Sequence, residues 1–364
     1  MCRKAACIVL LLLAPFLTAA GKTKDNPKVL LPPDLLLPEG RKLTYERSFR
    51  AEKDVRKEPG FWGKVLNVVA GEPEYRELIR PYGIAVDSHG RAIITDPGAR
   101  GIHIFDFEQR KYKFIERADK NRDPMVAPQC VAVDAEDNFY VTDSQSGKIF
   151  VFEASGKFKH VLGSLKGGEG YFKRPTGIAV DSAAQRIYVT DTLRDKIFVL
   201  DMQGSVMQTI GKHGTGKDEF YYPTELRLDE QNTDGHGGEK HDLMVVDAMN
   251  FRVQRVGRDG AFEGAIGQVG DSVGSLFRPK GIGIDSEGHL YVVDGLSGVV
   301  QVYDREGRLL YSFGGRGQGL GEFQLPMGLF IDRHDRIFVV DSFNRRVQVY
   351  RYYGLSKQAR GATP

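Results

Sequence analysis

The sequence is dominated by one repeated segment. A motif that begins with proline recurs six times, at Pro81, Pro128, Pro175, Pro223, Pro279 and Pro326, so that successive prolines are 47, 47, 48, 56 and 47 residues apart. A fixed period of this length is typical of solenoids, propellers and arrays, in which each copy buries its apolar face against the next. The chain is therefore expected to fold as adjoining copies of one unit.

A complete copy contains four short apolar runs that end at Asp or just before Asp or Gly. Examples of the four runs, in order, are 177–181, 290–294, 299–303 and 309–313. Runs of this length between turn residues predict short strands, and four antiparallel strands repeated radially describe a propeller blade. The content of 43 Gly, 21 Phe and 15 Tyr agrees with many tight turns between aromatic-rich strands. The predicted fold is all-β, a six-bladed β-propeller of four-stranded antiparallel blades.

The last copy lacks its fourth strand. The segment 63–71, which precedes the first copy, repeats the fourth-strand pattern seen at 204–211. We expect this N-terminal strand to complete the last blade, because joining the first and last blades removes two exposed sheet edges. A second short strand is expected at about 42–49, packed on the propeller.

The first twenty residues have the order of a signal peptide. Arg3 and Lys4 precede an apolar run over 5–16, and small residues follow it. The run is shorter than the roughly 20 residues that a membrane-spanning helix needs, so no transmembrane span is expected after cleavage. We predict an exported protein, periplasmic or extracellular, with a signal peptide at 1–20, a Pro-rich linker and leading segment at 21–62, the propeller at 63–353 and a tail at 354–364.

Cleavage leaves Cys130 as the one cysteine, which excludes a disulfide within the chain. The net charge of +3 includes Arg3 and Lys4. Without them 49 basic residues stand against 48 acidic ones, a balance that disfavours nucleic acid as a partner. We expect a monomer.

The repeat resembles the NHL family in its exported bacterial form. The resemblance is carried by the elements Pro-x-Gly-Ile-Ala-Val-Asp, Tyr-Val-Thr-Asp and Asn-x-Arg-Val-Gln-Val. The last of them occurs at Asn344 and, with Arg as its final residue, at Asn250. It covers about 63–353 and implies a six-bladed propeller. It leaves function open, since this family includes RNA binders, protein-binding modules and relatives that are lyases or lactonases.

The residue after each proline is expected at the mouth of the central channel, on the face where the innermost strand begins. These residues are Tyr82, Gln129, Thr176, Thr224, Lys280 and Met327. The next position is Gly in four copies and Cys130 and Glu225 in the other two. We interpret Cys130 as buried and inert, and Glu225 with Lys280 as an ion pair at the rim.

Metal chemistry at this mouth is disfavoured. The resemblance implies that amidating lyases hold zinc through His at such positions, and none of the six residues here is His. His89, His289 and His334 fall in turns on the opposite face. A lactonase-like calcium site needs six to eight oxygen ligands, and Glu225 and Gln129 are the obvious contributors. No cofactor or metal is predicted.

Two rings of Asp recur in the six copies. One ring follows the first strand and the other follows the second, and both are expected to bond backbone N–H groups of turns. Their members are Asp87, Asp134, Asp181, Asp229, Asp285 and Asp332, then Asp96, Asp143, Asp191, Asp247, Asp294 and Asp341. The insertion at 230–241 weakly resembles a calcium loop and is interpreted as a hairpin loop.

A non-catalytic role is favoured, because no complete catalytic set converges. We predict a binding scaffold whose face at the channel mouth binds a protein or polymer of the cell envelope. Arg and Asn in its loops suit carboxylates, phosphates or polar chains. The candidate binding residues are Tyr82, Arg100, Gln129, Arg194, Thr224, Glu225, Arg252, Lys280 and Arg345. The alternative is a metal-dependent lyase or lactonase-like hydrolase at the channel mouth, and RNA binding ranks third.

Overall fold

The computed structural model describes residues 31–56, 74–117, 124–230, 242–270 and 272–355. Residues 32–364 form one compact unit. Its described part consists of strands and three short 3-10 helices. None of these helices has the length and apolar character to cross a membrane. The predicted signal peptide at 1–20, the segment 63–71 and most of the insertion at 230–241 lie outside the described residues.

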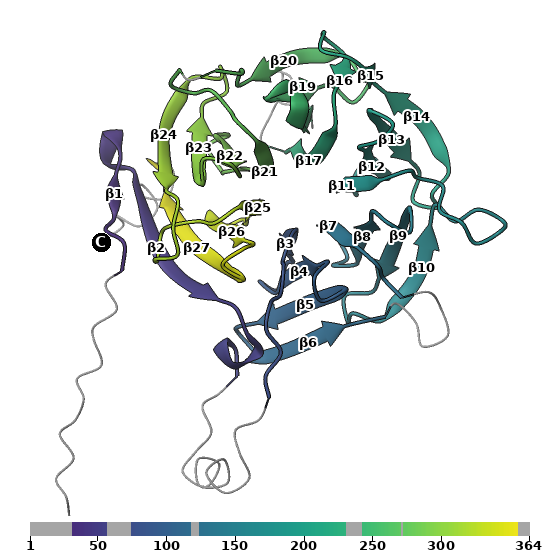
Figure 1. The fold of residues 1–364 in the computed structure, drawn as a ribbon, viewed down its shortest axis with the longest axis horizontal. Coiled ribbons are helices and arrows are strands. Elements are labelled where there is room, and N and C mark those ends of the chain that lie inside the picture. Colours follow the sequence, from purple (N-terminus) through teal and green to yellow (C-terminus); the bar gives the residue numbers. More distant parts are fainter. Residues whose placement is uncertain (1–30, 57–73, 118–123, 231–241, 271, 356–364) are drawn as a thin grey trace, which may run out of the picture. The chain divides into compact units, whose positions relative to one another are not determined.

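Five blades consist of four consecutive strands each, hydrogen-bonded in chain order. They are β3–β6 (Ile84–Val86, Ala92–Asp96, Gly101–Asp106, Lys111–Ile115), β7–β10 (Pro128–Val133, Phe139–Asp143, Lys148–Phe152, Phe158–Leu162), β11–β14 (Pro175–Asp181, Arg186–Asp191, Lys196–Leu200, Val206–Ile210), β17–β20 (Pro223–Asp229, Asp242–Asp247, Arg252–Val256, Phe262–Ile266) and β21–β24 (Pro279–Ile284, Leu290–Asp294, Val299–Tyr303, Leu309–Gly314). Between the third and fourth blades, β15 (Lys212–His213) pairs with β16 (Glu219–Phe220) in parallel. The innermost strands surround the centre of the ring (Figure 1).

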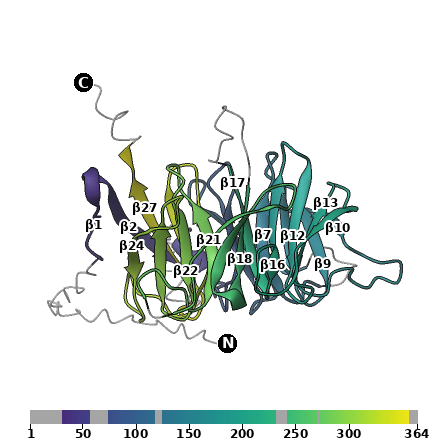
Figure 2. The same cartoon turned by 90° about the horizontal axis from the view of Figure 1, so that it is seen from above.

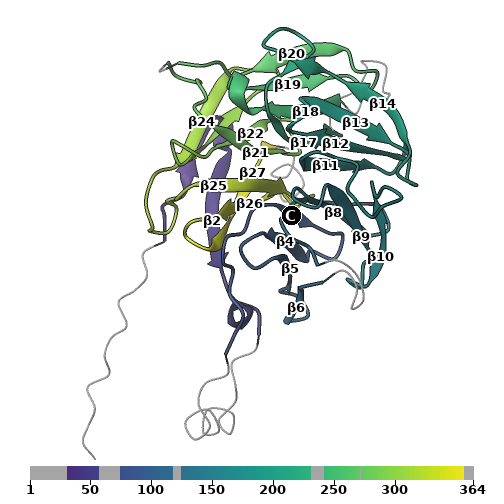
Figure 3. The same cartoon turned by 45° about the vertical axis from the view of Figure 1, so that its right-hand side comes forward.

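The sixth blade is completed from the N-terminus, as predicted, but by a different strand. It contains β25 (Pro326–Ile331), β26 (Arg336–Asp341) and β27 (Arg346–Tyr353), and the outer edge of β27 pairs with β2 (Lys42–Phe49). Figures 1 and 3 show β2 beside β27, and the short β1 (Leu35–Leu36) pairs with β2 in turn. Since β26 and β2 take both edges of β27, the assignment of 63–71 to this place is wrong. The physical reason is that Leu43, Tyr45 and Phe49 of β2 bury apolar side chains against the propeller core.

The core lies between neighbouring blades, in six apolar clusters that follow the ring. The cluster between the sixth and first blades contains Val347 and Val349 of β27, Phe105 of β5 and Phe49 of β2. The centroid of the Phe49 ring lies 4.9 Å from the centroid of the Phe105 ring. The N-terminal strand thus buries apolar surface on both sides of the closure.

The two faces of the ring have different loops. Each innermost strand begins on what we call the connector face, where the chain arrives from the previous blade and where the loop between second and third strands lies. It ends on the turn face, toward which β27 points in Figure 2. On the connector side, threonines of the second strands join adjacent blades: the hydroxyl of Thr142 donates to Thr176 O at 2.6 Å, and that of Thr190 donates to Thr224 O at 2.5 Å.

Candidate functional site on the propeller axis

The second ring of Asp has the structural role expected from the sequence. The buried carboxylate of Asp191 accepts the N–H groups of Lys173 and Arg174 at 2.8 and 2.9 Å. Asp294 accepts those of Phe277 and Arg278 in the same way, at 2.7 and 3.2 Å. These bonds hold the connector that leads into each blade, and the side chains of these four connector residues are exposed. The Asp ring therefore fixes the connectors while its own side chains stay buried.

The residues after the prolines lie at the start of the innermost strands, where the sequence predicted them. In five of these strands the register with the second strand shifts just after the proline, as at Pro175 and Ile178. A β-bulge of this kind re-aims side chains next to functional sites. Tyr82, Gln129, Thr224, Lys280 and Met327 are half-buried there, and Thr176 is buried.

Burial at the channel mouth shifts the pKa values of Tyr82 and Lys280. Burial raises the pKa of the Tyr82 phenol, and Cys130 and Glu225 raise it further. Burial lowers the pKa of the Lys280 ammonium, and the nearby Arg278 and Arg174 lower it further. Two arginines thus disfavour the charged form of Lys280 in addition to its burial.

The predicted ion pair between Glu225 and Lys280 is wrong. Glu225 is buried, and its Oε1 lies 2.8 Å from Nη2 of Arg227, two residues further along β17. No ion pair joins Lys280 to a carboxylate within the described residues. Burial raises the pKa of the Glu225 carboxyl to about 7, against the opposing effect of Arg227. Cys130 is buried as interpreted, and burial raises the pKa of its thiol well above the usual value.

The four candidate loop arginines have different surroundings. Arg252 is held by the protein: its Nε lies 2.9 Å from Asp247 Oδ2, and its Nη2 donates to Gly216 O and Glu219 O. Arg194 lies 3.6 Å from the buried Asp191 and over the ring of Tyr171. Arg100 and Arg345 are exposed. Arg252 therefore holds the connector between the third and fourth blades through hydrogen bonds to its carbonyls.

Sequence reasoning named Lys280 but missed the other four cations that flank the prolines. We call the two residues before and the one residue after each of the six prolines the proline-flanking ring. Its eighteen members include five cations and no carboxylate, and the cations are Arg80, Lys173, Arg174, Arg278 and Lys280. None of the five has an ion pair with another described residue. The signal was present in the sequence as basic residues at equivalent places in the repeat.

Apolar side chains are exposed on the same face. Four follow the second-strand Asp by two residues, in four successive blades, and three belong to the proline-flanking ring. They are between 37 and 51% exposed: Leu193, Met249, Leu296 and Phe343, then Ile79, Tyr222 and Phe277. The guanidinium of Arg80 lies 5.5 Å from the centre of the Phe343 ring. Exposed apolar groups and unpaired cations thus share the connector face, and Arg80 and Phe343 are in contact there.

The channel is crossed by Arg227. Its Nη2 donates to Leu329 O at 3.1 Å and to Ile84 O at 3.3 Å, and its Nε donates to Ile282 O at 3.4 Å. These carbonyls belong to the sixth, first and fifth blades. The residues at the same repeat position in the other blades are Ala85, Ala132, Ala179, Gly283 and Phe330. Arg227 therefore links the fourth blade to the blades across the channel, a role for which other copies have no group.

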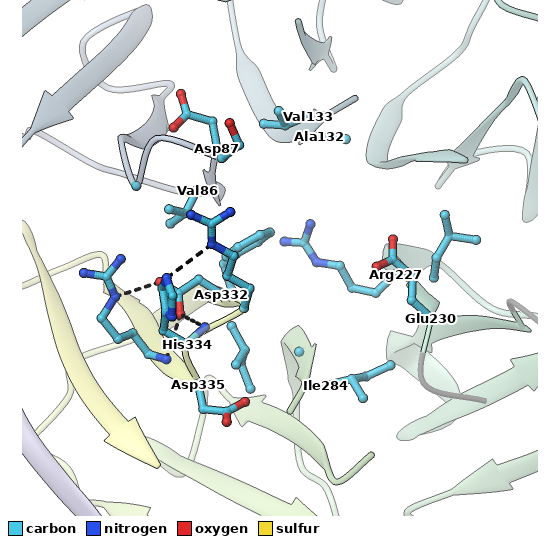
Figure 4. Close-up of a pocket in the computed structure, with 18 of the residues that line it drawn as sticks. Val86, Asp87, Ala132, Val133, Arg227, Glu230, Ile284, Asp332, His334 and Asp335 are labelled. Carbon is cyan, nitrogen blue, oxygen red and sulfur yellow. Dashed lines mark hydrogen bonds and ion pairs between the residues drawn. The ribbon is translucent and has the colours of Figure 1, made fainter. Parts of the chain in front are cut away.

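The turn-face end of the channel is a cavity of about 1080 Å³. Its lining combines apolar side chains of the innermost strands with about as much polar surface, and Arg227 points into it (Figure 4). Polar groups line its rim, including His89 and His334, which confirms the prediction that these two turns lie opposite the channel mouth. Asp87, His89 and Asp137 lie together at the rim, where Asp137 accepts the Ser88 hydroxyl at 2.6 Å and lies 2.9 Å from His89 Nδ1.

Comparisons with known proteins agree on the fold. The family DUF5128, described as a 6-bladed beta-propeller, matches residues 179–250 and 284–360. Among curated proteins, none matches the sequence.

Solved structures match over most of the chain. An auxiliary nutrient binding protein from Bacteroides thetaiotaomicron is 14% identical with a TM-score of 0.56, over 76% of this chain and 69% of that one. A protein of unknown function from the same organism is 15% identical with a TM-score of 0.56, over 76% and 70%. Virginiamycin B lyase from Staphylococcus aureus is 14% identical with a TM-score of 0.54, over 85% and 99%. At these identities the likeness concerns the fold, and together with the strand order it shows that this chain is a six-bladed β-propeller.

Proposed function

We propose that this chain is an exported, non-catalytic binding protein of the NHL type, whose connector face binds a protein or polymer of the cell envelope. One observation carries the proposal: the proline-flanking ring has five cations and no carboxylate. The five cations lack ion pairs with other described residues. Surface cations in ordinary proteins are interspersed with acids, so a one-sided ring favours an anionic partner.

Crowding of these cations supports the same conclusion. Burial lowers the pKa of Lys280, and the like charges of Arg278 and Arg174 lower it further, so the three cations repel one another. An anionic group bound at the channel mouth removes this repulsion and gains charge-assisted hydrogen bonds. The buried hydroxyl of Thr224, which has no hydrogen-bond partner among the described residues, lies at the same mouth.

The exposed apolar side chains add binding surface around the cations. Contiguous exposed apolar groups mark interaction sites more often than isolated ones, and interfaces combine apolar anchors with Arg. Here Leu296, Phe343 and Met249 are held at equivalent loop positions of neighbouring blades. The auxiliary nutrient binding protein of similar fold agrees with a binding role.

The decisive experiment is capture of a partner from the envelope fraction of the source organism. The triple variant Arg174→Glu, Arg278→Glu, Lys280→Glu is compared with wild type and with Arg333→Glu, which reverses an exposed charge on the turn face. We expect the triple variant to lose the captured partner and Arg333→Glu to retain it. Equal capture by all three proteins contradicts the proposal.

A lyase or lactonase-like hydrolase is the second candidate. Glu225 favours it, because a carboxyl with a pKa of about 7 is suited to general acid–base chemistry at neutral pH. Virginiamycin B lyase is among the proteins of similar fold. Elemental analysis of the purified protein separates the candidates, since this alternative requires stoichiometric calcium or zinc.

A further inference from the structure

The turn-face cavity has the construction of a small-molecule site. All six blades contribute to its walls, with Val86, Val133, Val180, Leu228, Ile284 and Phe330 among the lining residues. Its volume of about 1080 Å³ is slightly above the range of about 300–1,000 Å³ for pockets that hold drug-sized ligands. The apolar residues lie on the innermost strands and the polar residues lie mainly on the turns. The connector face described above lies at the other end of the channel.

Arg227 is the cation that enters this cavity from the channel. Its side chain points inward (Figure 4), and its Nη2 and Nε have partners in the protein. Its Nη1 has no hydrogen-bond partner among the described residues. An amino group of the guanidinium is thus presented to the cavity with its hydrogen atoms unused.

Three of the carboxylates that line the cavity, Asp87, Asp285 and Asp332, are already bonded within their own turns. Asp87 accepts the N–H groups of its turn and the guanidinium of Arg91, and Asp332 is paired in the same way with Arg336 at 2.7 Å. Asp285 accepts two N–H groups of its turn and lies 2.9 Å from His289 Nδ1. These acids close the turns and have little capacity left for a ligand cation.

We propose that the turn-face cavity binds a monovalent organic anion, a carboxylate with an apolar body, whose head group meets Nη1 of Arg227. The apolar walls contact the body, and the carboxylate accepts a charge-assisted hydrogen bond deep in the cavity. A second negative charge is disfavoured at the rim. There Asp134 has only uncharged partners among the described residues, and Glu108 is exposed.

Octanoate is a suitable probe, with octanol and octylammonium as matched ligands of the same length. Isothermal titration calorimetry with the full chain is expected to show octanoate binding at least tenfold more tightly than octanol or octylammonium. A dicarboxylate of similar length, suberate, is expected to bind more weakly than octanoate. Equal affinity for octanoate and octanol overturns the role of Arg227.

Two variants locate the site. The double variant Glu225→Gln, Arg227→Met removes the cation without leaving a buried unpaired carboxylate, and it is expected to abolish the preference for octanoate over octanol. Val133→Phe narrows the cavity and keeps Arg227, and it is expected to weaken both ligands at least tenfold. Lys159→Gln, which removes an exposed cation on the outermost strand β10, is the control and leaves binding unchanged. If the double variant does not fold, Val133→Phe decides: unchanged octanoate affinity in that variant overturns the proposal.

Discussion

The guanidinium of Arg227 lies against the carboxylate of Glu225 inside the central channel, with Nη2 2.8 Å from Oε1. The two residues are i and i+2 on one strand, so their side chains leave the same side of it. In the other blades the first position is Gly or Cys and the second is Ala, Gly or Phe. The fourth blade alone among the six copies therefore supplies a charged pair, which separates the mouth on the connector face from the cavity on the turn face.

Replacing Glu225 by Gln should change how stability depends on pH. The pKa of Glu225 is raised from 4.5 to about 7 in the folded protein, so between these values the folded state binds a proton that the unfolded state has lost. The stabilisation from this group is complete below pH 4.5 and is lost as the pH rises through 7. A shift of this size corresponds to about 3 kcal/mol.

Chemical denaturation between pH 5 and 8 measures this effect. The free energy of unfolding of wild type should fall more steeply with rising pH than that of Glu225→Gln. Glu108→Gln removes an exposed carboxylate of the turn face and should follow wild type. Parallel pH profiles for all three proteins would show that Glu225 titrates normally.

Phe49→Ala should weaken the closure of the ring. Phe49 is 2% exposed and packs against Phe105 and Phe107 of the first blade while its strand pairs with β27 of the last. Loss of a buried phenyl ring costs about 3–5 kcal/mol. Leu36→Ala, at a position 78% exposed on the neighbouring strand, should change thermal stability little. Comparable midpoints for both variants would mean that β2 does not close the propeller.

Arg252→Gln should destabilise the fold, whereas Arg345→Gln should not. Arg252 is bonded to the buried Asp247 and to two connector carbonyls, while Arg345 is exposed. Removing one partner of a buried charge pair costs about 3 kcal/mol, and a surface change away from such features costs within about 0.5 kcal/mol. Urea denaturation of the two variants tests this difference. Similar midpoints would restore Arg252 as a candidate for ligand contact rather than structure.

The double variant Met249→Ser, Phe343→Ser should weaken binding of the envelope partner without destabilising the fold. Both side chains are exposed on the connector face, so we expect the free energy of unfolding to change by no more than about 0.5 kcal/mol per site. Capture of the envelope partner should fall at the same time, because the apolar part of the interface is removed. Full capture by this variant would assign the binding to the cations alone.

Several features of the fold could be predicted from the sequence because they recur in every copy. The six prolines, the runs that end in Asp and the threonine and valine patterns of the second strands repeat at nearly constant spacing, and the observed blades follow them residue by residue. The missing fourth strand of the last copy was also readable. Its replacement was not, because the pattern of 63–71 resembles a fourth strand, and the choice of β2 depends on burial of Tyr45 and Phe49 against distant blades.

The sequence predicted where the residues of the candidate site lie but not which charged side chains pair there. The positions at the channel mouth follow from the repeat, and Tyr82, Gln129, Thr224 and Lys280 lie there. The partners of charged side chains do not follow from it, since Glu225 pairs with Arg227 rather than with Lys280 and Arg252 holds a connector. Both observed partners are near in the sequence, and the wrong prediction came from pairing charged residues of two different blades.

The sequence by itself thus determined a six-bladed propeller and the face on which each repeat position lies, because backbone hydrogen bonding and apolar alternation are local and repeat in every copy. Tertiary structure alone decided which N-terminal strand closes the ring, which cations stay unpaired on the connector face, and that Arg227 crosses the channel to carbonyls more than fifty residues away in sequence. Those outcomes depend on contacts between blades, which are set by packing and electrostatics at long range in the chain.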